Sequence, residues 1–147
     1  MTRYVIDTQL FIEAARDRKR ADELAAFSSA FLPRLLLHAV VVQEMLAGAT
    51  SRKWIKEVER GVIGPYERRG RIITPSRQAW KRSGEVVSEL VATKKLSPSG
   101  IRRSFVNDVL LAASCREEGV VLITRNAKDF ALIGTVEPVR FVEPWPT

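Results

Sequence analysis

Short, continuously apolar segments alternate with helical patterns along the chain, and this alternation constrains the fold more than any other feature. The clearest apolar segment is VVLIT, which follows Gly119, a residue type that suits the end of a helix. Strands of this kind belong to parallel sheets that are covered by helices on both faces. The expected strands are 3–6, 34–40, 71–74, 120–124 and 138–142. The expected helices are 9–27, 41–49, 53–63, 75–95 and 104–118, with a short turn or helix at 126–131. We therefore expect an α/β fold with a central, mostly parallel sheet.

Length and composition predict one cytoplasmic domain. A chain of 147 residues forms one ordinary domain, here 1–147, and buries about two thirds of its unfolded surface. No apolar run is long enough to cross a bilayer, and the N-terminus lacks the apolar core of a signal peptide. The single cysteine, Cys115, cannot form an internal disulfide, which fits a reducing compartment. The protein is therefore expected in the cytoplasm, without a membrane partner.

The net charge of +7 and the pI near 10.1 favour a polyanionic partner, either nucleic acid or an acidic protein. The basic residues gather in five short clusters, at 16–20, 68–71, 81–82, 94–95 and 102–103. Taken one at a time, each cluster is more simply interpreted as a solvated helix end or loop. Charge alone therefore does not choose between the two kinds of partner.

Acidic residues follow the ends of several expected strands. Asp7 follows the first strand, Glu44 comes just after the second, and Asp129 lies with Asn126 in the loop after the fourth. The carboxyl ends of parallel strands meet at one edge of a sheet, so these side chains can converge there. Each acid also has a simpler interpretation. Asp7 could cap the helix that follows it, Glu44 could pair with a basic residue, and Asp129 could cap a turn or pair with Arg125.

Asp108 is harder to explain without a special role. Its neighbours at helical spacing are all apolar, namely Phe105, Leu111, Ala112 and Cys115. A buried carboxylate has to be neutral, paired or bound to a cation. An N-cap at Ser104 would place Asp108 near the favourable first turn of its helix, but it would not explain the apolar neighbours.

The residue types that are missing narrow the chemistry further. The only histidine, His38, lies inside an apolar strand and is expected in the core or at its edge. The chain has no GxxxxGK[ST] phosphate loop, no GxGxxG and no cysteine-rich zinc spacing. Several carboxylates at one sheet edge repel one another unless a cation joins them, and oxygen ligands suit Mg²⁺ or Mn²⁺. Together with the basic charge, this favours a metal-dependent nuclease.

Three segments, VIDTQLFIEA, VVQEMLAGA and FVNDVLLAASCREEGVVLITRNAKDF, resemble the motifs of the PIN-domain ribonucleases, and most of all those of the VapC toxins of bacterial type II toxin–antitoxin systems. The resemblance implies a three-layer α/β/α sandwich. It implies a Mg²⁺- or Mn²⁺-dependent endoribonuclease that hydrolyses RNA phosphodiesters with metal-activated water. It also implies a homodimer and a cognate VapB-like antitoxin whose C-terminal segment would occupy the active-site groove.

The same resemblance implies roles for particular acids. Asp7, Glu44 and Asp108 match the first three acids of the family. Asp7 and Asp108 would be the principal metal ligands, and Glu44 would assist directly or through water.

The fourth acid departs from the pattern of many PIN domains, which carry an aspartate where this chain has Asn126. Asp129 is the nearest substitute and would complete the catalytic set. Thr124 and Asn126 would support it by orienting water or a carboxylate through hydrogen bonds. Thr8, beside Asp7, fits the small polar residue that the family usually has there.

Two other functions are compatible with the sequence. The departure at Asn126 suggests a PIN-like module that binds RNA or protein without cutting. A phosphatase or phosphoacceptor could use Asp7 as its nucleophile, but Gln9 stands where a second aspartate would be needed. If the protein cuts RNA, the basic residues nearest the acids in sequence could hold the backbone, namely Arg102, Arg103, Arg125 and Lys128.

Overall fold

The computed structural model describes residues 1–147 and is built around a five-stranded sheet in which every pairing is parallel. The strand order is β3-β2-β1-β4-β5, so β1 lies at the centre. The strands are β1 (Tyr4–Ile6), β2 (Leu35–His38), β3 (Ile72–Ile73), β4 (Val121–Ile123) and β5 (Phe141–Val142). The expected parallel sheet is confirmed, although all five strands are shorter than the expected segments.

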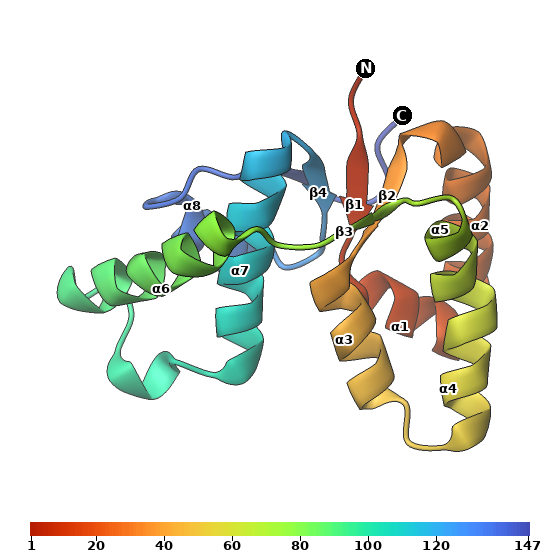
Figure 1. Cartoon of the computed structure of the whole chain (residues 1–147), viewed down its shortest axis with the longest axis horizontal. Coiled ribbons are helices and arrows are strands. Elements are labelled where there is room, and N and C mark those ends of the chain that lie inside the picture. The colour runs from red at the N-terminus through yellow and green to blue at the C-terminus, as the bar shows by residue number, and fades with distance from the viewer.

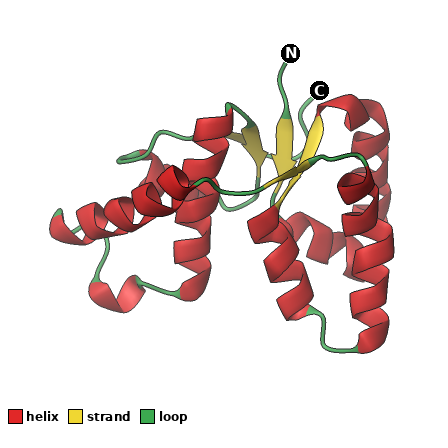
Figure 2. Cartoon of the chain, in the orientation of Figure 1, coloured by secondary structure: helices red, strands yellow, loops and turns green.

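Helices cover both faces of the sheet and complete three layers (Figures 1 and 2). The α-helices are α1 (Thr8–Arg16), α2 (Arg18–Phe31), α3 (Ala39–Gly48), α4 (Arg52–Val58), α5 (Gly64–Arg68), α6 (Arg77–Ala92), α7 (Arg103–Glu118) and α8 (Ala127–Gly134). Three short helices join them, the 3₁₀ helices η1 (Leu32–Arg34) and η3 (Pro98–Gly100) and the π-helix η2 (Glu59–Ile63). None of these helices combines the length and the hydrophobicity that a bilayer crossing requires.

Alternate side chains of the central strand pack into different layers. Val5 belongs to a core cluster formed with α6, α7 and α8, whereas Tyr4 and Ile6 belong to a cluster formed with α1 and α2. This alternation follows from the two-residue period of a strand. It explains why the strand sequences are continuously apolar, because both faces are buried.

The first helical region is interrupted at Asp17. The sequence pattern predicts one helix over 9–27, but Asp17 is extended, with φ −138° and ψ 124°, and its side chain accepts a hydrogen bond from the Lys19 backbone N–H. Asp17 therefore ends α1 and caps α2. The result is a helical hairpin on one face of the sheet.

The helix expected at 53–63 is longer and irregular. It continues to Arg68 as α4, η2 and α5, and the π-helical turn comes just before Pro65. Proline has no backbone N–H to donate to the preceding turn, so the regular α-helical bonding is interrupted there.

The helix that carries Asp108 starts earlier than a Ser104 cap would allow. Arg102 is the N-cap residue of α7, and its side chain makes no capping bond, so the expectation for Ser104 is wrong. The expected end is confirmed, because Gly119 closes α7 in the left-handed conformation with φ 66°. Asp108 thus lies in the second turn of α7.

A buried carboxylate fixes α7 against its neighbours. Glu137, only 3% exposed, accepts hydrogen bonds from Arg82 of α6, at 2.5 Å, and from Arg116 of α7. This triad could not be predicted from the sequence, because its members are far apart in the chain. It ties α6 and α7 to the connection between α8 and β5.

Candidate active site

Asp7 is held at the end of β1 by hydrogen bonds of its backbone and its carboxylate. Its backbone N–H donates to the Ile123 carbonyl at 2.9 Å, extending the pairing of β1 with β4. Its Oδ1 accepts from the Thr8 backbone N–H at 2.8 Å, and its Oδ2 accepts from the Thr124 hydroxyl at 2.6 Å. Burial raises the pKa of Asp7, the bonds from Thr124 and Thr8 act in the opposite direction, and the nearby Glu44 charge raises it further. Asp7 is thus an N-cap and at the same time a buried acid with a fixed orientation.

Glu44 faces Asp7 from the second turn of α3. Its Oε1 accepts from the Thr8 hydroxyl at 2.6 Å, and its Oε2 accepts from the Asn107 amide at 3.4 Å. Glu44 takes part in none of the salt bridges of the structure, so the expected alternative of a basic partner is wrong. Neutral donors from α1 and α7 orient this carboxylate instead.

Asp108 reaches the same region from α7. The neighbours on its helix face are buried as expected, but Asp108 itself is half-buried and opens onto a cavity. Burial, followed by the charges of Asp7, Glu44 and Asp129, raises the pKa of Asp108 to about 8, against a smaller opposing effect of Arg102. The fold therefore places a carboxyl group where its charge has no adequate compensation.

Asn126 links Asp108 to Asp129. It is the N-cap of α8, and its Oδ1 accepts from the Asp129 backbone N–H at 3.4 Å. Its Nδ2 donates to Asp129 Oδ2 at 3.0 Å and to Asp108 Oδ2 at 3.4 Å. The alternative pairing of Asp129 with Arg125 is absent, because Arg125 forms an ion pair with Glu13 at 3.0 Å.

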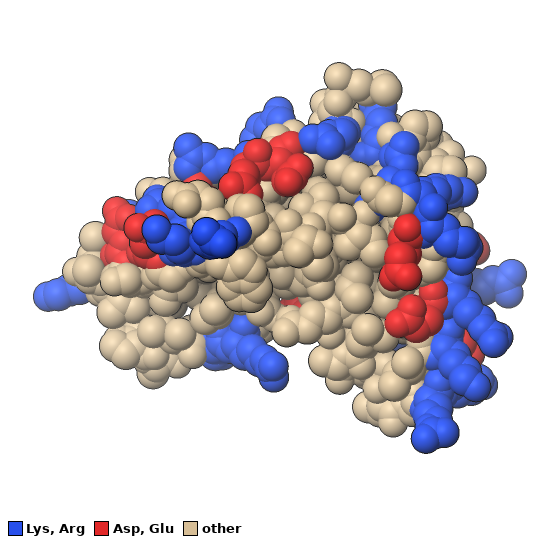
Figure 3. Space-filling model, viewed as in Figure 1, with Lys and Arg blue, Asp and Glu red and all other residues tan.

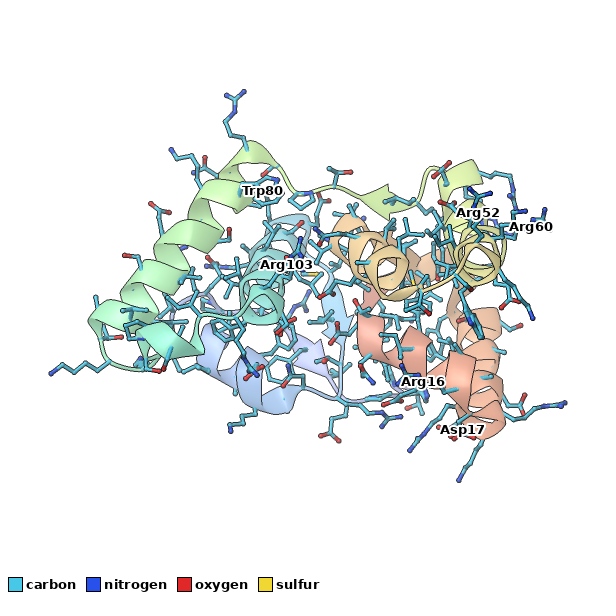
Figure 4. All side chains as sticks on the ribbon, turned by 90° about the horizontal axis from the view of Figure 1, so that it is seen from below. Arg16, Asp17, Arg52, Arg60, Trp80 and Arg103 are labelled. Atoms are coloured by element: carbon cyan, nitrogen blue, oxygen red, sulfur yellow. The ribbon has the colours of Figure 1, made fainter.

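Asp7, Glu44 and Asp108 open onto a cavity of about 690 Å³ between α1, α3 and α7. Asp7, Glu44 and Asp108 line it together with Asn126, but Asp129 is not among its lining residues. Arg103, the first residue of α7, also lines the cavity, and Figure 4 looks toward this side of the molecule. The structure thus brings three of the four expected acids to one cavity and leaves the fourth behind Asn126.

A second cavity, of about 640 Å³, adjoins the first and shares Ile12 and Gly48 with it. It lies between α1, α3 and α4, and its lining is mostly apolar, including Phe11, Met45 and Trp54. The two cavities are therefore neighbours that share part of their lining, the first lined by the acids and the second mostly by apolar side chains.

Asn107 was missed by the sequence analysis. Besides donating to Glu44, its amide donates to Gln43 Oε1 at 3.2 Å, so that it bridges α7 and α3 across the cavity. Its position next to Asp108 was the available signal. An asparagine beside a helical acid has many simpler explanations, so the signal was weak.

The one histidine and the one cysteine, His38 and Cys115, are unsuited to catalysis. His38 is buried, bonds Ser114 through Nε2 at 2.8 Å and accepts from the Val40 backbone N–H through Nδ1. Burial lowers the pKa of His38 to about 4, so it is neutral at physiological pH. Burial also raises the pKa of the Cys115 thiol, which leaves it protonated. The chemistry of this site is therefore that of its carboxylates.

The donor set fits a hydrated hard cation better than a tightly chelated one. No group of three or more His, Cys, Asp or Glu side chains is arranged to hold a metal ion directly. Mg²⁺ is typically bound through one or two carboxylates and keeps several waters, so such a group is not required. Asp7 and Asp108 provide two carboxylates in one cavity, and the raised pKa of Asp108 marks the lack of a compensating charge.

An all-parallel sheet with acids gathered at its carboxyl edge places the chain among the α/β proteins that carry their site at that edge. Sequence comparison then gives the family. The model of the PIN domain matches residues 4–135, so the chain belongs to the PIN domain family. No curated protein sequence matches the chain.

Solved structures share this fold at low sequence identity. A chain of the DNA-bound VapBC from Salmonella typhimurium superposes with a TM-score of 0.69 at 17% identity, over 97% of this chain and 98% of that one. A chain of FitAcB from Neisseria gonorrhoeae superposes with a TM-score of 0.68 at 19% identity, over 98% of this chain and 99% of that one. A chain of VapBC-1 from nontypeable Haemophilus influenzae has a TM-score of 0.66 at 22% identity, over 95% of this chain and 96% of that one. The expected likeness to PIN-domain proteins of the VapC kind is confirmed in the fold.

Proposed function

We propose that this protein is a metal-dependent endoribonuclease and the toxin of a type II toxin–antitoxin pair. The observation that carries the proposal is the convergence of Asp7, Glu44 and Asp108 on one cavity without a basic partner. Membership of the PIN domain family supports nuclease activity. RNA as the substrate, and Mg²⁺ or Mn²⁺ as the cofactor, are the finer parts of the proposal.

In this mechanism Asp7 and Asp108 would hold the ion, and the neutral donors around them keep their oxygens in place. When bound, the ion supplies an activated water and stabilises charge on the phosphodiester. Glu44, oriented by Thr8 and Asn107, positions water beside the scissile phosphate and can accept its proton. Asn126 and Asp129 support Asp108 from behind. No side chain becomes covalently attached to the RNA.

Basic side chains are available to hold the RNA backbone. Arg103 lines the acidic cavity and forms no ion pair. A band of Lys and Arg also follows the α4 side of the molecule (Figure 3), where the exposed residues are Arg52, Lys53, Lys56 and Arg60. Figure 4 labels Arg52 and Arg60 on this side. This charge would attract RNA at a rate and affinity that fall with salt.

The proposed partner is a VapB-like antitoxin. The structural neighbours come from VapBC and FitAB complexes, which supports a protein partner of this kind. The acidic cavity and the neighbouring apolar cavity are suited to an antitoxin segment that lies across both and blocks access to Asp7 and Asp108. A homodimer and a cytoplasmic location complete the proposal.

The test is RNA cleavage by purified wild-type protein and by Asp108→Asn. We expect cleavage in Mg²⁺ or Mn²⁺, none in EDTA, and a loss of at least about 100-fold in the variant, as for loss of a charge that acts directly in the transition state. Circular dichroism and thermal melting establish that both proteins are folded. Cleavage by folded Asp108→Asn at the wild-type rate would contradict the assignment. RNA binding in EDTA, without cleavage in either metal across many substrates, would favour a binding module instead.

A further inference from the structure

The orientation of the Asn126 amide is fixed by its role as a helix cap. Its Oδ1 accepts from the Asp129 backbone N–H, which an amide nitrogen could not do. The opposite end, Nδ2, therefore points at the carboxylates of Asp129 and Asp108. An N–H donor thus stands between two acids that come from different helices.

This arrangement separates the four acids into two sets. Asp7, Glu44 and Asp108 face the cavity, while Asp129 lies behind Asn126 and does not line it. The Asp129 carboxylate accepts its one side-chain hydrogen bond from Asn126. A cation placed between Asp108 and Asp129 would meet a donor N–H₂ group, whereas Mg²⁺ and Mn²⁺ require oxygen ligands.

We propose that Asn126 restricts the site to a single divalent ion, held on the Asp7 side of Asp108, and that Asp129 is a positioning residue and not a ligand. The inference rests on the proposed metal-dependent function. Turning the amide to offer its oxygen to a second ion would break the cap of α8, which opposes such a rearrangement.

The experiment measures Mn²⁺ binding to the intact chain without RNA, by isothermal titration calorimetry and by electron paramagnetic resonance. The wild type is expected to bind one ion per chain, with no magnetic coupling between ions. Asn126→Asp keeps a good N-cap residue but replaces the N–H donor by oxygen, so it is expected to bind two ions that are magnetically coupled. Gln9→Glu is the matched control, because Gln9 lines the same cavity and gains the same charge without contacting Asp108. It is expected to keep one ion.

A second pair of variants tests the role of Asp129. Asp129→Asn retains an oxygen that can accept from Asn126, so we expect it to bind one ion with an affinity within about threefold of wild type. Asp7→Asn removes a ligand of the ion. Loss of a supporting residue typically weakens metal binding by about 10- to 100-fold, and we expect a larger loss for Asp7→Asn. Thermal melting of every variant establishes that it is folded.

Two coupled ions in the wild type, no ion in the wild type, or an Asp129→Asn defect as large as that of Asp7→Asn would each overturn the inference. RNA cleavage measured in parallel distinguishes this failure from failure of the proposed function. Cleavage with two bound ions contradicts the inference alone, whereas one bound ion without any cleavage contradicts the nuclease function alone.

Discussion

Thr124 donates its hydroxyl to Asp7 Oδ2 at 2.6 Å, joining two residues that are 117 positions apart in the sequence. Both residues are buried, and each follows the end of a central strand. The pairing of β1 with β4 sets this contact, because Asp7 and Thr124 continue the register of Ile6 with Ile123. The most buried acid of the site is therefore oriented by the sheet itself.

Removing this hydroxyl should impair the site and the fold together. In Thr124→Val, Asp7 loses its one side-chain donor, and the buried carboxylate is left less satisfied. We expect cleavage to fall by about 10- to 100-fold and the free energy of unfolding to fall by about 1–3 kcal/mol. Initial rates and urea denaturation measure the two effects. Thr124→Ser keeps the hydroxyl and should retain most of the activity. Equal defects in both variants would mean that packing matters more than the hydrogen bond.

The stability of the metal-free protein should depend on pH through Asp108. In the unfolded chain this group titrates near 3.8, but in the folded protein its pKa is about 8. Between these values the folded state binds more protons than the unfolded state, so stability falls as pH rises through this window. In EDTA the melting temperature should therefore decrease with pH, by about 2–4 °C for each kcal/mol lost.

Asp108→Asn is the control for this pH dependence, because an amide does not titrate and the slope should flatten. Added Mg²⁺ should raise the melting temperature of the wild type more at the alkaline end than at the acidic end, since protons and the ion compete for the same carboxylate. A wild-type slope that persists in Asp108→Asn would assign the effect to other groups.

The Glu137 triad should stabilise the fold without taking part in cleavage. In Glu137→Gln, two half-exposed or exposed arginines lose their buried counterion, and they can turn partly to water. We expect a loss of about 1–3 kcal/mol, because hydrogen bonds to charged groups are weakened, with an unchanged cleavage rate per folded molecule. Glu85→Gln is the control, because Glu85 contacts Arg82 at 3.8 Å with its own side chain 64% exposed. Its cost should stay below about 1 kcal/mol.

Arg103 should contribute to RNA binding through charge. Arg103→Ala should weaken binding in EDTA for all RNA sequences to a similar extent, and reduce the slope of log affinity against log salt by about 0.7 for single strands. Fluorescence anisotropy across a salt series measures this slope. Arg125→Ala is the matched control, because Arg125 is already paired with Glu13. An identical change of slope in both variants would argue against a specific role for Arg103.

The sequence predicted the fold class and the main acids for physical reasons that are local. Strands buried on both faces have to be continuously apolar, and VVLIT and its counterparts carry that pattern. Asp7 follows its strand directly, so its place at the sheet edge is set by the backbone. The break at Asp17 was visible only as a helix-capping residue within a helical pattern, and tertiary packing of α1 against α2 decided it.

Only the tertiary structure decided how the acids are divided. The sequence placed Asp129 among the candidates, but in the structure its carboxylate bonds Asn126 and does not line the cavity that Asp7, Glu44 and Asp108 share. The tertiary structure also brings Arg125 to Glu13, and Arg82 and Arg116 to Glu137. Local spacing in the sequence cannot reveal these pairs. The periodicity of apolar residues is a local property that a sequence determines by itself. Which donor meets which carboxylate depends on strand order and helix packing, and these are set by contacts between residues far apart in the chain.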